Sequence, residues 1–450
     1  MKKYLIVFVL LFGWVTIVSA TCLEFAGPLE LGAGEGPVQQ AAVLKLQNYL
    51  KADLGLTDFI PDGFFSRRTR TYLIAFQQKY RLVSTGKLDQ ATIDLIKKTT
   101  CSEPGSDRAG QLAKALAANI MNSYPPVASG RDVDYTRALA VIGVEAAATR
   151  FGLVGTDNYL QRYADAITDK NGKILSNSSS VDANNVLKGM ILLSVYEKTH
   201  NGRYLKGAKN LAEQKVFQSR HLSDGGMVHA GGDQLWADTL YMVGPFLGRL
   251  GKATGDQKYF AEGAKQFIVH ADHLQDSATG LFHHAWDQSS GIIPAYWGRA
   301  NGWAIMGLVT FLEYLPENYP DRPALLSILN KQAEALAKNQ NSAGLWYQIL
   351  DRPTEKKNWT ETSGSSMFTY ALARAVHKGF LAASYQTTAE KGWKGLETKA
   401  ILRGSKVTVK DIVIGTTASS NLNDYYTNKK KDNDPHGLGS FLLAATEMAK

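Results

Sequence analysis

The segment GGDQLWADTLYM, residues 231–242, contains the acidic side chain best placed for chemistry. Asp238 follows Trp236 by two residues and precedes an apolar run with helical spacing. Burial among large apolar side chains disfavours the ionised form of a carboxylic acid and raises its pKa, so the acid can donate a proton near neutral pH. An Asp at this point can equally cap the first turn of a helix. The residues alone leave both interpretations open.

A second candidate group is the segment WGRANGW, which combines two tryptophans with one arginine. Indole rings can stack on the apolar faces of a sugar, and the planar guanidinium of Arg299 can bind both oxygens of a carboxylate. Trp297, Arg299 and Trp303 therefore form a candidate site for a sugar acid. The alternative is that the tryptophans pack in the core and Arg299 belongs to a structural ion pair.

The elements that must position these residues are helical. From residue 107 onward, about twelve segments carry apolar residues at helical spacing. The segments come in pairs, and about six such hairpins predict an all-α fold, an (α/α)6 barrel with inner helices around a cavity. One of these helices is expected over 235–250, through Asp238. The best strand candidate is 407–413, where apolar and polar residues alternate.

The first residues indicate export. Lys2 and Lys3 precede an apolar run over 4–18, and small residues follow at 18–20. This pattern predicts a signal peptide over 1–20, which places the protein outside the cell or in the periplasm and leaves no membrane span after cleavage.

The chain has two cysteines, and they flank one compact segment. In an exported chain, Cys22 and Cys101 suggest a disulfide that ties the ends of this segment together. Two unpaired thiols are the alternative.

Residues 21–104 are expected to form a small N-terminal domain. Apolar residues at helical spacing predict three short helices, over 41–50, 69–80 and 90–98. The segments VLKLQNYL, DGFFSRRTRTYLIAFQQKY and GKLDQATIDLI resemble the peptidoglycan-binding domain family. This resemblance implies a cell-wall glycan as a partner, and a helical spacer without a wall ligand is the alternative. An EPGS linker then leads into the catalytic domain expected over 105–450.

The formal net charge of +9 is compatible with an acidic partner. The basic residues are dispersed, apart from the run Lys429–Lys431. A nucleic-acid binder would gather them on one face, so nucleic acid is not expected as a partner.

The larger domain resembles the unsaturated rhamnogalacturonyl hydrolases, glycoside hydrolase family 105, which are related to the unsaturated glucuronyl hydrolases. The matching motifs include GGDQLWADTLYM, GLFHHAWD, WGRANGWAIMG and NDPHGLGSFLLAATE, in this order. The resemblance implies an (α/α)6 barrel with no metal and no cofactor. It also implies removal of a 4,5-unsaturated uronic acid from the non-reducing end of lyase-cut oligosaccharides, above all from rhamnogalacturonan. An unsaturated glucuronyl hydrolase acting on another polyuronide and a non-catalytic glycan-binding protein are the alternatives.

The reaction implied by the resemblance is hydration of an enol ether. An acid protonates C4, water adds at C5, and the resulting hemiketal opens and releases the next sugar. One carboxylic acid can donate the proton and then, as carboxylate, assist the water. The motif places this acid on Asp238 and a supporting carboxylate on Asp182, although Asn184 lies at the expected distance before Gly189. A second Asp nearby would raise the pKa of Asp238 by like-charge repulsion.

The resemblance also assigns the binding residues. His229 and His284 match histidines that contact the sugar. Trp297, Arg299 and Trp303 match the residues that hold the unsaturated uronate ring.

Overall fold

The computed structural model describes residues 23, 25–80, 82–100, 107–126, 133–175, 182–230 and 232–450. The chain divides into two compact units, Met1–Gly105 and Ser106–Lys450. The predicted signal peptide, Cys22 and Cys101 lie outside the described residues, so the signal peptide and the disulfide stay predictions.

The small unit contains the three predicted helices, α1 (Pro37–Leu54), α2 (Arg67–Lys79) and α3 (Gln90–Thr100). Gln47 on α1 is fully buried, and its side-chain amide bonds to Asp62 and to the hydroxyl of Thr69. These bonds fix the loop between the first two helices. The apolar core of this unit consists of Leu29, Val43, Leu46, Tyr49, Leu50, Phe65, Leu73, Phe76, Leu88, Ile93 and Ile96.

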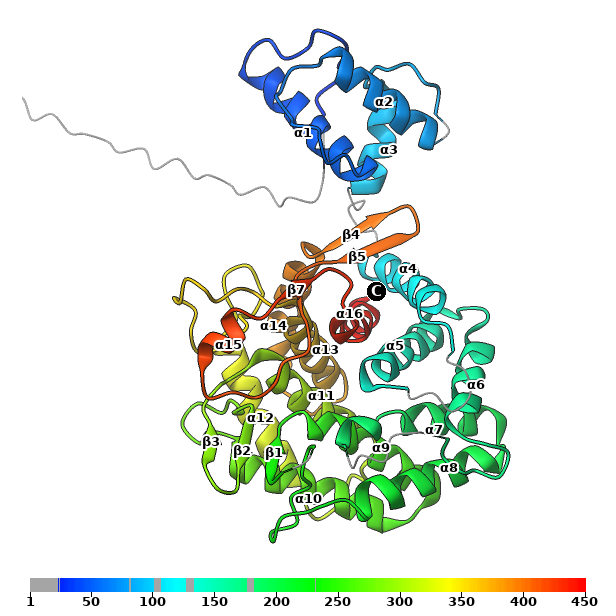
Figure 1. The fold of residues 1–450 in the computed structure, drawn as a ribbon, viewed down its shortest axis with the longest axis vertical. Coiled ribbons are helices and arrows are strands. Elements are labelled where there is room, and N and C mark those ends of the chain that lie inside the picture. Colours follow the sequence, from blue (N-terminus) through cyan, green and yellow to red (C-terminus); the bar gives the residue numbers. More distant parts are fainter. Residues whose placement is uncertain are drawn as a thin grey trace, which may run out of the picture. The chain divides into compact units, whose positions relative to one another are not determined.

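The larger unit is an (α/α)6 barrel, as predicted (Figure 1). Its inner ring, in order of contact, is α5 (Tyr135–Phe151), α7 (Gly189–Thr199), α9 (Thr239–Thr254), α11 (Gly298–Tyr314), α13 (Thr362–His377) and α16 (Pro435–Met448). The ring closes because α16 packs against α5. The outer helices are α4 (Arg108–Ser123), α6 (Thr156–Ile167), α8 (Gly202–Ala212), α10 (Gln257–Leu274), α12 (Arg322–Lys338) and α14 (Tyr385–Glu397).

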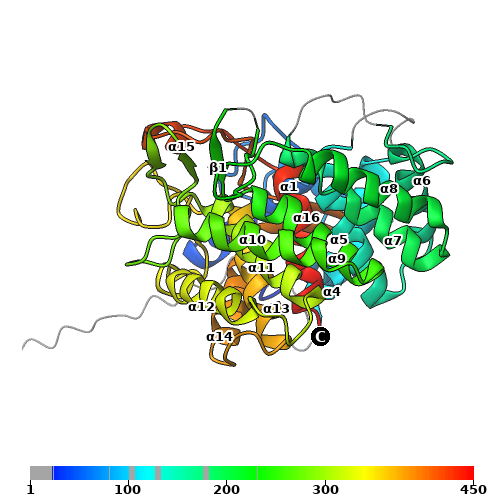
Figure 2. The ribbon, with the colours of Figure 1, turned by 90° about the horizontal axis from the view of Figure 1, so that it is seen from below.

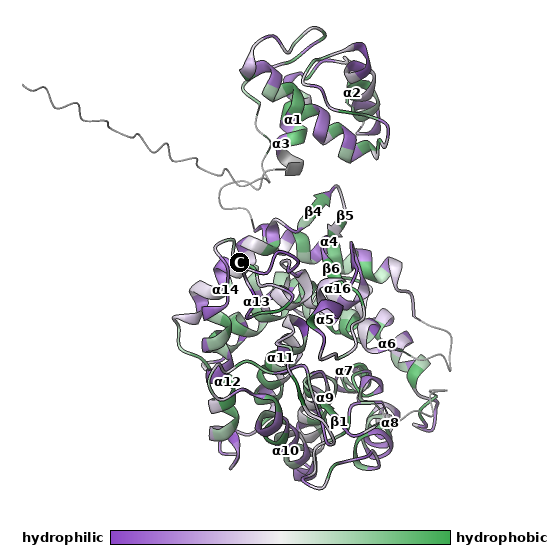
Figure 3. Ribbon diagram, turned by 60° about the vertical axis from the view of Figure 1, so that its left-hand side comes forward, coloured by the Kyte–Doolittle hydropathy of each residue, from purple (hydrophilic) through white to green (hydrophobic). Residues whose placement is uncertain are grey.

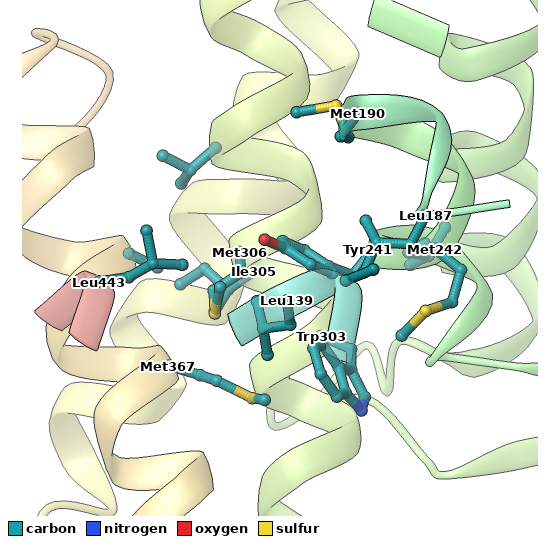
Figure 4. Close-up of a cluster of buried hydrophobic side chains, with 14 of the residues drawn as sticks. Leu139, Leu187, Met190, Tyr241, Met242, Trp303, Ile305, Met306, Met367 and Leu443 are labelled. Carbon is teal, nitrogen blue, oxygen red and sulfur yellow. The ribbon is translucent and has the colours of Figure 1, made fainter. Parts of the chain in front are cut away.

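The inner and outer helices differ in how their hydrophobic residues are distributed. Thirteen of the sixteen residues of α9 are buried, because this inner helix is covered on almost every side. Outer helices such as α10 and α12 carry hydrophilic and hydrophobic residues on different faces (Figure 3), as expected for helices with one side in solvent. Side chains from several inner helices meet in one apolar cluster that includes Tyr241, Trp303 and Leu139 (Figure 4).

Each inner helix is preceded by an outer helix that runs the opposite way, so the six inner helices begin at the same end of the barrel. Short elements gather at this end: η1 (Ala183–Asn185), β1 (Gln234–Trp236) and α15 (Leu422–Tyr426). Figure 2 shows β1 and α15 at one end and the C-terminus at the other. Among the described residues, no helix is long and apolar enough to cross a membrane.

Two sequence-based expectations need correction. The helix expected over 235–250 begins only at Thr239, because Gln234–Trp236 forms β1 and pairs antiparallel with β2 (Ala285–Asp287), which in turn pairs with β3 (Gly291–Ile293). Three-residue strands are too short to show alternation in the sequence.

The strand expected over 407–413 is two strands. Asp411 adopts a positive φ of 54° and turns the chain between β5 (Lys406–Val409) and β6 (Ile412–Val413). β5 pairs with β4 (Ala400–Arg403), whereas β6 pairs with β7 (Lys430–Lys431). Each half therefore belongs to a different sheet.

The packing of α9 against α11 depends on Gly307. A Cβ atom there would lie 2.7 Å from the carbonyl oxygen of Leu240, on the backbone of α9. We predict that Gly307→Ala lowers the free energy of unfolding by about 1–3 kcal/mol, because the helices must move apart. Thermal unfolding measures the change. The matched control is Gly202→Ala at the start of α8, where a Cβ atom meets nothing within 4 Å. Equal melting temperatures for the two variants would contradict this account of the packing.

Candidate active site

Asp238 lies between β1 and the first turn of α9. Its backbone adopts φ −58° and ψ −36°, and its side chain makes no capping hydrogen bond to the helix. Of the two interpretations left open by the sequence, the helix cap is therefore not how the carboxyl group is used. Oδ2 lies instead 3.5 Å from Nε2 of His284.

The two oxygens of Asp238 have different surroundings. Oδ2 is buried and has no hydrogen-bond partner. The side chain as a whole keeps 14% exposure, and almost none of it belongs to Oδ2. Oδ1 is thus the oxygen that a bound molecule can reach.

His284 precedes β2 and is completely buried beneath the carboxyl group. Its Nδ1 lies 2.8 Å from the hydroxyl oxygen of Tyr425 on α15. Its ring packs against Trp297 and Trp236, with centroid distances of 4.5 and 5.0 Å. The structure therefore places His284 against the acid, and the sugar contact implied by the family resemblance stays a prediction.

His229 closes the other side of the site. Its ring stacks on Trp236 with a centroid distance of 4.9 Å and an interplanar angle of 7°. Nδ1 lies 2.9 Å from the hydroxyl of Thr239, the residue after Asp238. Nε2 lies 3.3 Å from the amide nitrogen of Asn184. Burial lowers the pKa of His229, although the charges of Asp238 and Asp182 raise it in part.

Asp182 and Asn184, the two candidates for the supporting position, make different contacts. The Asp182 carboxylate accepts a 2.9 Å hydrogen bond from the backbone amide of Asn184 and so caps η1. Its charge acts on His229 and on Tyr135 of α5. Asn184 instead reaches the site directly through the His229 ring. Asp182 thus supplies charge and Asn184 supplies a hydrogen bond.

Arg299 is fixed by the backbone. Its Nη1 donates to the carbonyl oxygen of Val413 at 2.6 Å, and Nη2 donates to that of Ile414 at 2.7 Å. The guanidinium lies over the Trp297 ring, 4.6 Å from the centroid, and Arg299 is only 2% exposed. Both prongs of the fork thus bind carbonyl oxygens of the chain itself. The charge of Arg299 reaches Asp238, where it favours the carboxylate.

The two tryptophans of the motif are almost completely buried. Trp303 packs against Tyr241 and Tyr135, with centroid distances of 5.3 and 6.2 Å, so the core interpretation describes its packing here. Trp297 differs from Trp303 in one respect. Its indole Nε1 is buried and has no hydrogen-bond partner, which leaves a donor at the site without an acceptor.

Electrostatics at Asp238 run against the expectation of a raised pKa. Burial raises the pKa of this acid, but His284, His229 and Arg299 together outweigh burial and lower the pKa below its ordinary value of 3.8. The reason is that the approach of His284 to Oδ2 and the charges of His229 and Arg299 favour the carboxylate. Asp238 is therefore a carboxylate at neutral pH in this structure.

Comparison with known proteins identifies the family. The model described as "Glycosyl Hydrolase Family 88" matches residues 112–450, which is most of the chain. The protein belongs to Glycosyl Hydrolase Family 88. The model described as "Putative peptidoglycan binding domain" matches residues 39–96 of this family 88 protein. Both matches confirm the resemblances noted from the sequence motifs.

Three similar proteins illustrate the relationship. Unsaturated rhamnogalacturonyl hydrolase YesR of Bacillus subtilis is 35% identical over 42% of this chain and 57% of its own length. Unsaturated 3S-rhamnoglycuronyl hydrolase of an Alteromonas species is 33% identical over 47% of this chain and 50% of its own. The chain thus spans about half the length of these curated relatives. A solved structure of a family 105 glycoside hydrolase from C. acetobutylicum is 29% identical, with a TM-score of 0.70 over 76% of this chain and 99% of that one.

Sequence reasoning missed two contributors to the family 88 site. Trp236 was visible beside Asp238, but nothing in the sequence showed that its ring lies between His229 and His284. Tyr425 is 141 residues from its partner His284 and stands in a polar segment without helical periodicity. No local signal marked it.

The lowered pKa of Asp238 makes a pH-dependent prediction. A depressed carboxyl pKa contributes stability that is present above the unfolded-state pKa of about 3.9 and is lost as the pH falls through the folded-state value. We predict that the difference in unfolding free energy between wild type and Asp238→Asn changes in this acidic window, with the wild type losing more stability. Denaturant unfolding at pH 7 and at pH 3 measures it. Asp272→Asn, an exposed residue of α10, controls for loss of one surface charge. A wild-type advantage that grows toward low pH would refute the lowered pKa.

Proposed function

We propose that the protein hydrates the 4,5-unsaturated uronic acid at the non-reducing end of lyase-generated oligosaccharides and so releases this sugar. The observation that carries the proposal is the asymmetric carboxyl group of Asp238. One oxygen is buried against His284, and the side chain keeps 14% exposure, so the other oxygen is the one left for a bound molecule. An acid arranged in this way can deliver one proton to a bound molecule in a fixed direction.

The proposed chemistry needs only one acid. Protonated Asp238 donates to C4 of the enol ether, and the double-bond electrons shift to leave a cation at C5 that the ring oxygen stabilises. Water adds at C5 while the new carboxylate of Asp238 accepts a proton from it. The resulting hemiketal opens by breaking its C5–O5 bond, which forms a ketone at C5 and leaves C1 as a hemiacetal. This hemiacetal then breaks its bond to the next sugar, which leaves as an alcohol while C1 becomes an aldehyde. Asp238 then ends the cycle protonated, as it began.

The lowered pKa of Asp238 fits this cycle because a bound substrate would change the electrostatics around the carboxyl group. An unsaturated uronate brings its own negative charge toward Arg299 and His284. That charge offsets the positive potential which now favours the Asp238 carboxylate, and a like charge nearby raises a carboxyl pKa. In this proposal, substrate binding itself raises the pKa of Asp238, so that its carboxylate takes up a proton.

The substrate class is proposed from the relatives. The name of the Bacillus relative specifies an unsaturated rhamnogalacturonyl group, and the name of the Alteromonas relative specifies an unsaturated 3S-rhamnoglycuronyl group. We favour unsaturated rhamnogalacturonan products, with an unsaturated glucuronyl-type substrate as the second candidate. A glycan-binding protein without catalysis is the alternative from another class.

Location and tethering are also proposals. The basic and apolar pattern over 1–20 supports export to the periplasm or the medium. The family match over residues 39–96 supports a cell-wall glycan as partner of the small unit.

The decisive experiment uses oligosaccharides made by lyases from several polysaccharides. Turnover removes the conjugated double bond, so the ultraviolet absorbance of the unsaturated uronide should decay, fastest with rhamnogalacturonan products. We predict that Asp238→Asn lowers the rate by at least about 100-fold, because it removes the general acid, while Asp272→Asn keeps wild-type activity. No decay with any unsaturated uronide would overturn the enzymatic proposal. Full activity of Asp238→Asn would overturn the mechanism alone.

The roles of Asp182 and Asn184 can be separated by substitution. Asp182→Asn removes the charge but keeps a side chain that can cap η1, since Asn and Asp cap helices about equally well. We predict that it lowers kcat by about tenfold, equivalent to about 1.4 kcal/mol in the barrier, and that KM changes little. Asn184→Ala is the companion variant, because it removes the bond to His229 and leaves the charge. If Asp182→Asn is fully active and Asn184→Ala is impaired, the supporting role belongs to Asn184.

A further inference from the structure

Tyr425 brings a hydroxyl group to the far side of His284. It lies on α15, in the segment between β6 and α16, and it is completely buried. Its hydroxyl oxygen lies 2.8 Å from Nδ1 of His284. The backbone amide of Ser419 donates to the same oxygen at 3.0 Å. Two neighbours therefore share one phenol oxygen.

The two contacts determine where the hydrogens lie. A backbone amide can only donate, so Ser419 occupies one acceptor site of the phenol. If Nδ1 of His284 also donated, the phenol hydrogen would need a third partner, and among the described residues Tyr425 has none for its hydroxyl. Burial raises the pKa of Tyr425, so the phenol keeps its hydrogen. Tyr425 therefore donates to Nδ1, and the hydrogen of the neutral imidazole lies on Nε2.

We propose that Tyr425 is a positioning residue that fixes His284 in the Nε2–H tautomer and thereby directs the catalytic proton of Asp238 onto Oδ1. Nε2 of His284 faces Oδ2 of Asp238 at 3.5 Å. A proton on Oδ2 would point at the Nε2 hydrogen, and the two would repel each other. The proton must then be carried on Oδ1, the oxygen that a bound molecule can reach. The consequence for catalysis rests on the proposed function, whereas the tautomer does not.

The segment that carries Tyr425 is held in place from the barrel. Arg299 on α11 bonds the carbonyl oxygens of Val413 and Ile414, a few residues before Ser419. The side-chain amide of Gln348 donates to the carbonyl oxygen of Tyr425 at 3.2 Å. These bonds connect the barrel motif to the hydroxyl group that orients His284. Arg299 therefore acts at the site through the backbone as well as through its charge.

The test begins without substrate. Nitrogen NMR of protein labelled in its histidines distinguishes a protonated Nδ1 from a protonated Nε2, and the His284→Gln variant identifies the His284 signals. We expect His284 to carry its hydrogen on Nε2 in the wild type. In Tyr425→Phe, which loses only the hydroxyl, we expect the Nδ1–H form to appear. Tyr426→Phe is the matched control, because Tyr426 is the next residue of the same helix and is only partly buried. A wild-type His284 protonated on Nδ1 would overturn the proposal, and this measurement needs no variant of Tyr425.

Kinetics provide the second measurement. We expect Tyr425→Phe to lower kcat by about 10–100-fold with little change in KM, a smaller loss than removal of a general acid. In the His284→Gln background, the same substitution should cost nothing further, because its partner is already gone. Losses that multiply in the double variant would refute action through His284. If no unsaturated uronide is turned over, the proposed function fails, but the NMR result still decides the tautomer.

Discussion

The site depends on the placement of one carboxylate in a largely buried position, where ionisation is energetically unfavourable. Removing a carboxylate from water costs several kcal/mol unless partners compensate. At Asp238, His284, His229 and Arg299 compensate for the loss of water by favouring the ionised form. None of these partners makes a short ion pair with it, since the nearest contact is the 3.5 Å approach of His284. The carboxylate is therefore stabilised by its surroundings but is not tied to a single cation, and it can gain and lose a proton without breaking a strong bond.

The opposite end of the barrel handles buried charge differently. There Arg249 forms ion pairs with Glu145 and Glu197, and Arg374 bonds Glu313 in a two-pronged arrangement. A cavity of about 480 Å³ lies among these side chains, but its charged groups already have partners. At the active-site end, the indole Nε1 of Trp297, Oδ2 of Asp238 and Nε2 of His284 are all buried without a hydrogen-bond partner. Buried polar groups normally have hydrogen-bond partners, so these three atoms call for an explanation, and the proposed function supplies one.

Local pattern was enough to predict the barrel, and tertiary contacts decided everything at the site that the pattern did not show. Helical spacing repeats within a few residues, so the inner and outer helices could be read from the sequence, and the acid at Asp238 stood out because its neighbours in sequence are apolar. The start of α9 was misplaced because β1 exists only through its register with β2, where Trp236 pairs with Ala285. The pKa of Asp238 was expected in the wrong direction because two of the groups that lower it, His284 and Arg299, come from other helical hairpins further along the chain.

Arg299 shows how one residue can satisfy two apparently exclusive interpretations. The sequence offered a carboxylate clamp or a structural partner, and its guanidinium nitrogens do bond backbone carbonyls, at Val413 and Ile414. Carbonyl oxygens carry only partial charges, and Nη1 reaches a carboxylate only indirectly, through the Ser363 hydroxyl that donates to Glu361. The charge of the guanidinium therefore still favours the ionised form of Asp238. Bonding to backbone therefore lets Arg299 hold the segment that carries Tyr425 and still supply the positive potential that an anionic sugar would meet on entering the site.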